Sequence, residues 1–183
     1  MLNGHLTMDS TELQTLIPWC NEAELPGEAE LFVELNVRSL APPTGTHEGQ
    51  TDVIETLSDL ESAGVIEELR LCVFGERICP CDTCGDTRPG RAALDRVREY
   101  QRWAANLDTE VSIPFERRTI HSEIAETDYE VIVPPRVSLG IYDDATLLGV
   151  FPCEIGDTVY TVGDVIEALE PSHAVENPVL ADS

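Results

Sequence analysis

Apolar and polar positions along the chain predict strands that alternate with helices. From Leu31 to Val37 every second residue is apolar, which is typical of a strand with one buried face. Between residues 91 and 107, apolar residues recur at helical spacing around Trp103, which makes this the clearest helix. The predicted order is a strand over 31–40, a helix over 51–63, a strand over 69–75, a helix over 91–107, a strand over 111–118, a hairpin of 137–142 and 147–151, and a helix over 162–169.

The two ends of the chain differ from this middle part. A short helix is predicted to begin at Asp9 or Ser10, with Glu12 placed for a capping box, and Pro18 ends it. We expect residues 1–28 to form an N-terminal tail, residues 29–170 a single α/β domain, and the polar residues 171–183 a C-terminal tail.

The element order predicts an α/β (α+β) sandwich, because strands that alternate with helices form parallel crossovers and a hairpin adds antiparallel strands. The order βαβα(β)ββα, with Pro134 and Pro135 before the hairpin, is similar to a thioredoxin-like domain, in which a proline precedes the third strand. A ferredoxin-like sandwich is one alternative. A domain that contains a winged helix is another, because residues 53–78 combine a helix, a glycine turn and a strand.

The composition is strongly acidic. The 183 residues include 35 acidic and 11 basic side chains, for a net charge of −24, and 42% of the residues are hydrophobic, which is enough for a core. Every basic residue is arginine, a bias that a GC-rich genome would also produce. At molar salt the Debye length is about 3 Å, so that only near neighbours still repel. We therefore expect a salt-adapted protein of a halophilic archaeon.

The sequence contains no run of 18 apolar residues and no N-terminal secretory signal. We therefore expect a cytoplasmic protein without a membrane partner. Six cysteines in such a chain indicate metal binding, redox chemistry or burial rather than a disulfide framework.

Three of the cysteines, Cys79, Cys81 and Cys84, lie close together in a loop bounded by proline and glycine. Thiols at this spacing can bind one Zn²⁺, which takes four ligands in a tetrahedron. The candidates for the fourth ligand are Cys72, Cys153, His121 and His47. However, only one pair has the two-residue spacing usual in structural zinc sites, and burial beside Phe74 would explain Cys72 equally well.

Residues 81–84 also form a CxxC pair, as in thiol redox proteins. In a thioredoxin-like domain the reactive pair follows the first strand, where the dipole of the first helix lowers the pKa of the thiol. The corresponding residues here, 41–50, contain no cysteine. We therefore do not favour redox catalysis.

Seven arginines and five acidic residues give the window 88–118 a net charge of +2, whereas the rest of the chain carries −26. The candidate residues for binding an anion, a nucleic acid or an acidic partner are Arg91, Arg98 and Arg102 on one helix face, with Arg117 and Arg118. The alternative is a solvated face that pairs with Asp95 and Glu99. Because phosphate contacts weaken steeply with salt, we expect a protein partner, with DNA electrostatically disfavoured.

The sequence contains no phosphate-binding glycine loop, dinucleotide fingerprint, GxSxG or HExxH motif. Five segments resemble a known family: VELNVRSLAPPTG (33–45), LxxLExAGxIEE (57–68), VFGERI (73–78), RAALDRVREYQRWA (91–104) and, most specifically, SLGIYDDATLLGVFPCEIGDTVYTVGDVIEALE (138–170). Over about three-quarters of its length the chain thus resembles small haloarchaeal proteins labelled helix-turn-helix domain-containing proteins. The resemblance implies a role associated with transcription and no catalytic residues. The stretch CPCDTC (79–84) is not part of that pattern.

We therefore predict a non-enzymatic α/β module with a regulatory or interaction role, associated with transcription. The first alternative is a zinc- or thiol-dependent protein that uses Cys79, Cys81 and Cys84. The second is a thioredoxin-like scaffold that has lost its redox pair and only binds a partner.

Overall fold

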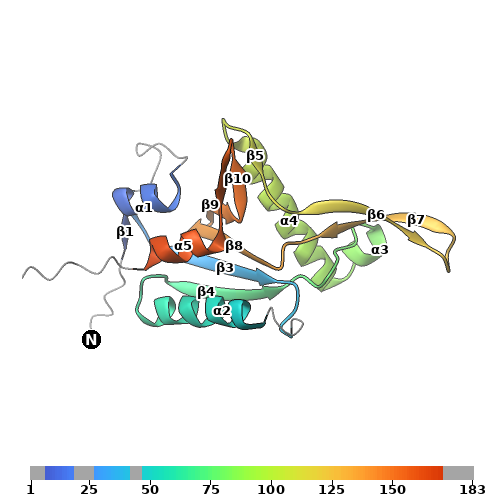
Figure 1. Cartoon of the computed structure of the whole chain (residues 1–183), viewed down its shortest axis with the longest axis horizontal. Coiled ribbons are helices and arrows are strands. Elements are labelled where there is room, and N and C mark those ends of the chain that lie inside the picture. The colour runs from blue at the N-terminus through green and yellow to red at the C-terminus, as the bar shows by residue number, and fades with distance from the viewer. Residues whose placement is uncertain (1–6, 19–26, 42–46, 171–183) are drawn as a thin grey trace, which may run out of the picture.

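Four strands form the main sheet of the computed structural model, which describes residues 7–18, 27–41 and 47–170 (Figure 1). In sheet order they are β4 (Glu68–Val73), β3 (Leu31–Val37), β8 (Val137–Asp143) and β9 (Thr146–Phe151). β3 and β4 are parallel, β8 is antiparallel to β3, and β9 is antiparallel to β8. The hairpin of β8 and β9 and the mixed α/β character are as predicted.

Helix α2 (His47–Ser62) connects the parallel strands β3 and β4. Residues 53–78 therefore form a strand–helix–strand crossover together with β3, and the winged helix considered for this segment is wrong. The physical reason is that β3, which precedes the helix, provides the pairing partner of β4 over six residue pairs. The two parallel strands are direct neighbours, unlike the split pair of a ferredoxin-like sandwich.

Helices cover both faces of the main sheet. The alternating residues of β3 from Leu31 to Val37 are buried in one cluster with side chains of α1 (Ser10–Leu16), α2 and α5 (Val162–Leu169). On the opposite face, α4 (Arg88–Asn106) buries Leu94, Val97 and Tyr100 in a second cluster. The predicted strand face and helix stripe are thus confirmed, because both are set by local periodicity.

The short helices begin where the sequence predicts. Asp9 caps α1 and exchanges a capping box with Glu12, and Thr161 caps α5 in the same way with Asp164. Although these helices are short, each cap satisfies backbone N–H groups that have no partner within the helix.

Part of the predicted N-terminal tail is folded. Leu13, Leu16 and Ile17 are buried in the first cluster, and two short strands, β1 (Met8–Asp9) and β2 (Glu28–Ala29), pair beside α1. The tail assignment fails here because the apolar face of α1 has a partner, α5. The predicted C-terminal tail, residues 171–183, lies outside the described residues.

The strand predicted over 111–118 is two strands of different sheets, separated by the loop that contains Pro114. β5 (Val111–Ser112) joins β10 (Cys153–Ile155) and β11 (Thr158–Tyr160) in a small sheet. β6 (Glu116–Ser122) pairs instead with β7 (Thr127–Val133) in a two-stranded ribbon that extends away from the main sheet (Figure 1). β7 was not predicted, because its first four residues are exposed and show no apolar alternation.

A single-turn helix, α3 (Asp82–Gly85), precedes α4 and lies near the base of the ribbon (Figure 1). Within the described part of the chain, no helix is both long enough and apolar enough to cross a membrane.

Candidate functional site

The loop that carries the clustered cysteines is held at both ends by backbone hydrogen bonds. At its start, Ile78 is buried and exchanges two hydrogen bonds of 2.8 Å with Ile132 of β7. At its end, Cys81 occupies the N-cap position of α3, and its carbonyl accepts a hydrogen bond from the N–H of Gly85. The loop thus connects the base of the ribbon to α3.

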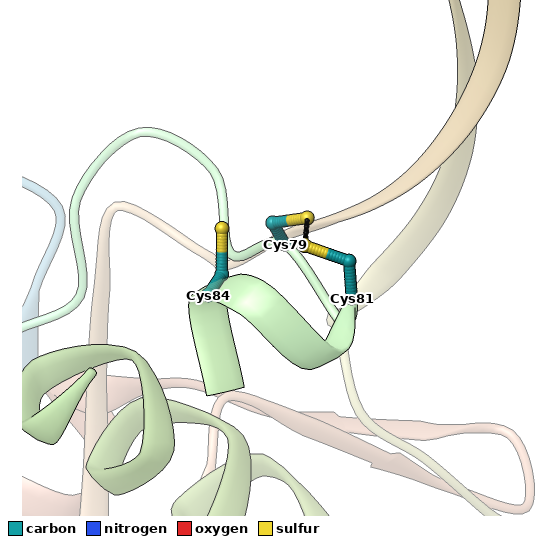
Figure 2. Close-up of side chains that lie close together, drawn as sticks. All are labelled: Cys79, Cys81 and Cys84. Atoms are coloured by element: carbon teal, nitrogen blue, oxygen red, sulfur yellow. Dashed lines mark hydrogen bonds between the residues drawn. The ribbon is translucent and has the colours of Figure 1, made fainter. Parts of the chain in front are cut away.

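This geometry brings three thiols together. Figure 2 shows Cys79 and Cys81 with their sulfur atoms side by side and Cys84 projecting from α3 on the same side of the loop. The Sγ atoms of Cys79 and Cys81 are 2.8 Å apart, and all three Sγ atoms lie within 4.8 Å of one another. Thiolates bound tetrahedrally at about 2.3 Å from zinc lie about 3.8 Å apart, so small side-chain rotations would accommodate one ion.

Hydrogen bonds between the thiols shift their proton affinities in opposite directions. A hydrogen bond from Cys79, together with the backbone N–H of Cys84, lowers the pKa of Cys81. Cys84 donates to Cys81 and Cys79, which raises the pKa of Cys84 to about 11. The cluster therefore favours a thiolate on Cys81, and a thiolate is the form of cysteine that binds metal ions.

The predicted fourth ligands lie elsewhere. Cys72 is on β4, and burial followed by the charge of Glu34 raises the pKa of its thiol. Cys153 is buried in the first core cluster, where burial raises its pKa to about 12. His121 hydrogen-bonds Asp128 across the ribbon, and the side chain of His47 lies outside the described part of the structure. Among the described residues, the metal-ligand group consists of the three loop cysteines alone.

The three candidate arginines of α4, Arg91, Arg98 and Arg102, lie on its solvent-exposed face. Arg98 pairs with Asp95 at 3.4 Å, Arg102 donates to the carbonyl of Arg98, and Arg91 pairs with Asp86 at 3.6 Å. The side chains of Arg91 and Arg98 are each 64% exposed. Surface pairs of this kind contribute at most about 1 kcal/mol, so an anionic ligand could displace the carboxylates.

The structure brings the cysteine loop and these arginines together, which the sequence did not predict. A hollow of about 330 Å³ between α3 and α4 is lined by Cys81, Arg91 and Arg98, together with three aspartates, Asp82, Asp86 and Asp95. A second hollow, lined by Arg98 and Arg102, shares Asp95 and Arg98 with the first. We call this continuous stretch, Cys81 with Arg91, Arg98 and Arg102, the cysteine–arginine surface.

The other two candidate arginines lie on the ribbon. Arg117 is paired in register with Ile132, the residue that bridges to Ile78, and Arg118 follows it. Both are exposed, and each contacts an acidic residue, Arg117 with Glu130 and Arg118 with Glu116. They therefore lie at the base of the ribbon, near the start of the cysteine loop.

A buried polar network anchors α4 to the sheet. Arg96 faces inward and binds Glu34 of β3 through two contacts of 2.5 Å, although Glu34 is fully buried. Tyr100 donates to Glu34 and accepts from the amide of Asn36 at 2.7 Å. Burial raises the pKa of Glu34, and the positive charge of Arg96 opposes this shift. This network was not predicted, although two polar residues at alternate positions of a predicted strand, Glu34 and Asn36, were a signal for it.

The anchor determines which side of α4 faces solvent. Since Arg96 is held against β3, residues two and six positions further along the helix, Arg98 and Arg102, point away from the sheet. The arginines of the cysteine–arginine surface are therefore displayed by a helix whose rotation about its axis is fixed.

Comparison with known proteins adds a family but no characterised relative. Searches of curated proteins and of solved structures found no match. A family model described as a helix-turn-helix domain matches residues 26–174. The matched range spans the main sheet, α4 and the ribbon, so the chain belongs to this helix-turn-helix domain family.

Proposed function

We propose that this protein is a regulator that binds nucleic acid through α3, α4 and the ribbon of β6 and β7. The observation that carries the proposal is the arrangement of α3 and α4: a one-turn helix ends at Gly85, a long helix begins at Arg88, and the exposed face of the second helix carries three arginines. Two helices joined by a short turn, with the second presented to the ligand, are the elements of a helix-turn-helix.

Charge supports the α4 and ribbon parts of this surface. Outside residues 88–118 the chain carries −26, so a polyanion is repelled almost everywhere else. Guanidinium groups bind phosphate oxygens in bidentate fashion, and Arg98 and Arg102 make only weak contacts that a phosphate could replace. The ribbon arginines, Arg117 and Arg118, extend the basic surface in the direction of the ribbon.

The test is binding of duplex DNA of random sequence to the full chain, measured by fluorescence anisotropy over a series of salt concentrations. Each lost phosphate contact should reduce the slope of log K against log salt by about 0.9. We expect this reduction for Arg98→Ala and for Arg102→Ala, and no change for Arg70→Ala, which removes the same charge from β4. Unchanged slopes in the α4 variants, or no binding at any salt concentration, would refute the proposal.

An acidic protein is a second kind of partner for the same arginines. A protein carboxylate accepts the same bidentate hydrogen bonds as a phosphate but carries less charge. Polyglutamate competing as well as DNA of equal charge would favour this partner and count against nucleic acid.

A second candidate function is zinc binding by Cys79, Cys81 and Cys84, which the proximity of the three sulfur atoms favours. Zinc analysis of the purified chain should give about one equivalent, as for a single tetrahedral site. The content should fall in Cys81→Ser and stay unchanged in Cys72→Ser. A content far below one equivalent in the wild type would eliminate this candidate.

We also infer the setting of this surface. The strand order β4-β3-β8-β9 supports a thioredoxin-like scaffold that is used for support and not for redox chemistry, since residues 41–50 contain no cysteine. The acidic excess and the absence of lysine support a halophilic protein that works at molar salt. Urea unfolding at increasing potassium chloride tests this setting, because stability should rise up to molar salt.

A further inference from the structure

We infer that a soft divalent cation bound by Cys79, Cys81 and Cys84 regulates the nucleic-acid surface by fixing α3 against the start of α4. This inference rests on the proposed function, and it adds a regulator to it. The cation would be one that thiolates prefer, with Zn²⁺ as the first choice.

The contacts between α3 and α4 provide the coupling. The carbonyl of Cys84 accepts hydrogen bonds from the backbone N–H of Thr87 at 3.2 Å and from its hydroxyl at 2.7 Å. The same hydroxyl accepts from the N–H of Gly90 and so caps α4. A change in the position of Cys84 is therefore transmitted directly to the first turn of α4.

The junction is also tightly packed. A Cβ atom at Gly90 would lie only 2.1 Å from the carbonyl oxygen of Cys84, so only glycine allows this approach. Arg91, the next residue, donates from its side chain to the carbonyl of Gly85 at 3.1 Å. The position of Arg91, the first arginine of the cysteine–arginine surface, thus depends on where α3 ends.

Apart from its backbone hydrogen bonds and its contacts with the start of α4, α3 has little to hold it. It consists of four residues, none of them buried. A single helical turn is unfavourable by itself, because ordering its backbone costs more than its few hydrogen bonds return. Ligands at Cys81 and Cys84 would bridge this turn, so a bound cation would supply the missing stabilisation.

Cys79, the third ligand, extends the stabilising effect of the cation to the ribbon. Cys79 follows Ile78 directly, and Ile78 is hydrogen-bonded to Ile132 at the ribbon base, opposite Arg117. A cation that joins Cys79 to Cys84 would therefore fix α3, and with it the start of α4, relative to the ribbon. Both elements of the proposed nucleic-acid surface would then be held in one geometry.

The described residues leave the fourth coordination position to solvent, since the group contains three thiols and no other ligand. Because cysteine binds metal ions as a thiolate, binding of the cation releases the thiol protons to solvent and involves no redox step. One of the three ligand residues, Cys81, also lines the hollow that contains Arg91.

The experiment uses the full chain, with Co²⁺ as a spectroscopic probe and Zn²⁺ as the regulating ion. Co²⁺ should produce thiolate charge-transfer bands that Zn²⁺ abolishes at one equivalent. Hydrogen exchange should then slow at the amides of residues 82–91 on loading with Zn²⁺, and affinity for DNA should rise at least about fivefold, the lower range of an allosteric coupling. Cys81→Ser and Cys84→Ser should lose all three responses, whereas Cys72→Ser should keep them.

The outcomes separate this inference from the proposed function. One equivalent of Zn²⁺ bound without slower exchange at residues 82–91, or no cation bound, would overturn the coupling even if the protein binds DNA. Slower exchange on loading supports the coupling within the protein. If DNA then fails to bind in either state, the proposed function is refuted and the cation regulates a surface for another ligand. Both serine variants replace side chains close to the proposed nucleic-acid surface. Their far-UV circular dichroism spectra should match that of the wild type, which would show that the fold is intact.

Discussion

Replacing Arg96 with methionine would leave Glu34 buried without its counter-charge. Methionine keeps much of the length of the arginine stem, so little packing is lost. Breaking a buried ion pair by removing one partner costs about 3–5 kcal/mol. The Arg96 side chain is 26% exposed, so we expect a loss near the lower end of this range, about 3 kcal/mol.

The stability lost in Arg96→Met depends on pH, and the pKa of Glu34 determines the direction of this dependence. Burial raises the pKa of Glu34, so its folded-state pKa lies above the unfolded value. The stabilisation linked to its proton is therefore complete below the unfolded pKa and is lost as the pH rises through the folded pKa. Without Arg96 the folded pKa of Glu34 rises further, and the deficit of Arg96→Met should therefore grow as the pH rises from acidic to neutral.

Urea unfolding at constant molar salt measures these free energies, because urea is uncharged and leaves the screening unchanged. Adding Glu34→Gln to Arg96→Met should recover more than about half of the lost stability, since no buried charge then remains. Arg98→Met, on the exposed face, should change stability by less than about 0.5 kcal/mol. A deficit of Arg96→Met that is independent of pH, or a double variant whose loss equals the sum of the single losses, would refute the reasoning.

Two further predictions concern the α3–α4 junction and the N-terminal segment. Gly90→Ala should destabilise the fold by about 1–3 kcal/mol through its clash with Cys84, although alanine has the higher helix propensity. In the control Gly163→Ala the nearest atom is 3.5 Å away, and stability should rise by up to about 1 kcal/mol; equal effects of the two variants in urea unfolding would contradict the packing argument. Leu13→Ala should cost about 2–5 kcal/mol, as for a core leucine. A loss below about 0.5 kcal/mol, typical of a surface site, would mean that α1 is not part of the folded domain.

The elements that the sequence predicts correctly are those whose signals are local. The alternation from Leu31 to Val37 identifies β3, and Asp9 with the capping-box residue Glu12 identifies the start of α1. In each case neighbours in sequence determine the backbone geometry, so no knowledge of the tertiary structure is needed.

The ribbon could not be predicted in this way. β6 and β7 are exposed over most of their length, so no apolar periodicity marks them, and their pairing depends on backbone hydrogen bonds. Similarly, the apolar face of α1 predicts a helix but does not identify α5 as its partner. Both errors concern contacts that only the folded chain brings about.

The sequence identified the cysteines and the arginines separately, but not as parts of one surface. Their proximity follows from the cap at Thr87 and the close approach at Gly90, and neither residue type is distinctive by itself. The Glu34–Arg96 pair, 62 residues apart, was missed because a helix face rich in arginine does not reveal which arginine turns inward.

The anchored helix has a consequence for recognition at high salt. If the protein works at molar salt, as proposed, the Debye length is about 3 Å and long-range attraction between the arginines and a polyanion is almost absent. Binding must then come from direct contacts, whose number depends on how accurately Arg91, Arg98 and Arg102 match the ligand. A mobile helix would lose part of this contact energy to ordering, whereas a helix held by Glu34 and Arg96 would not. For this reason the rigidity of α4 and its junction with α3, more than the net charge of the window, should determine affinity.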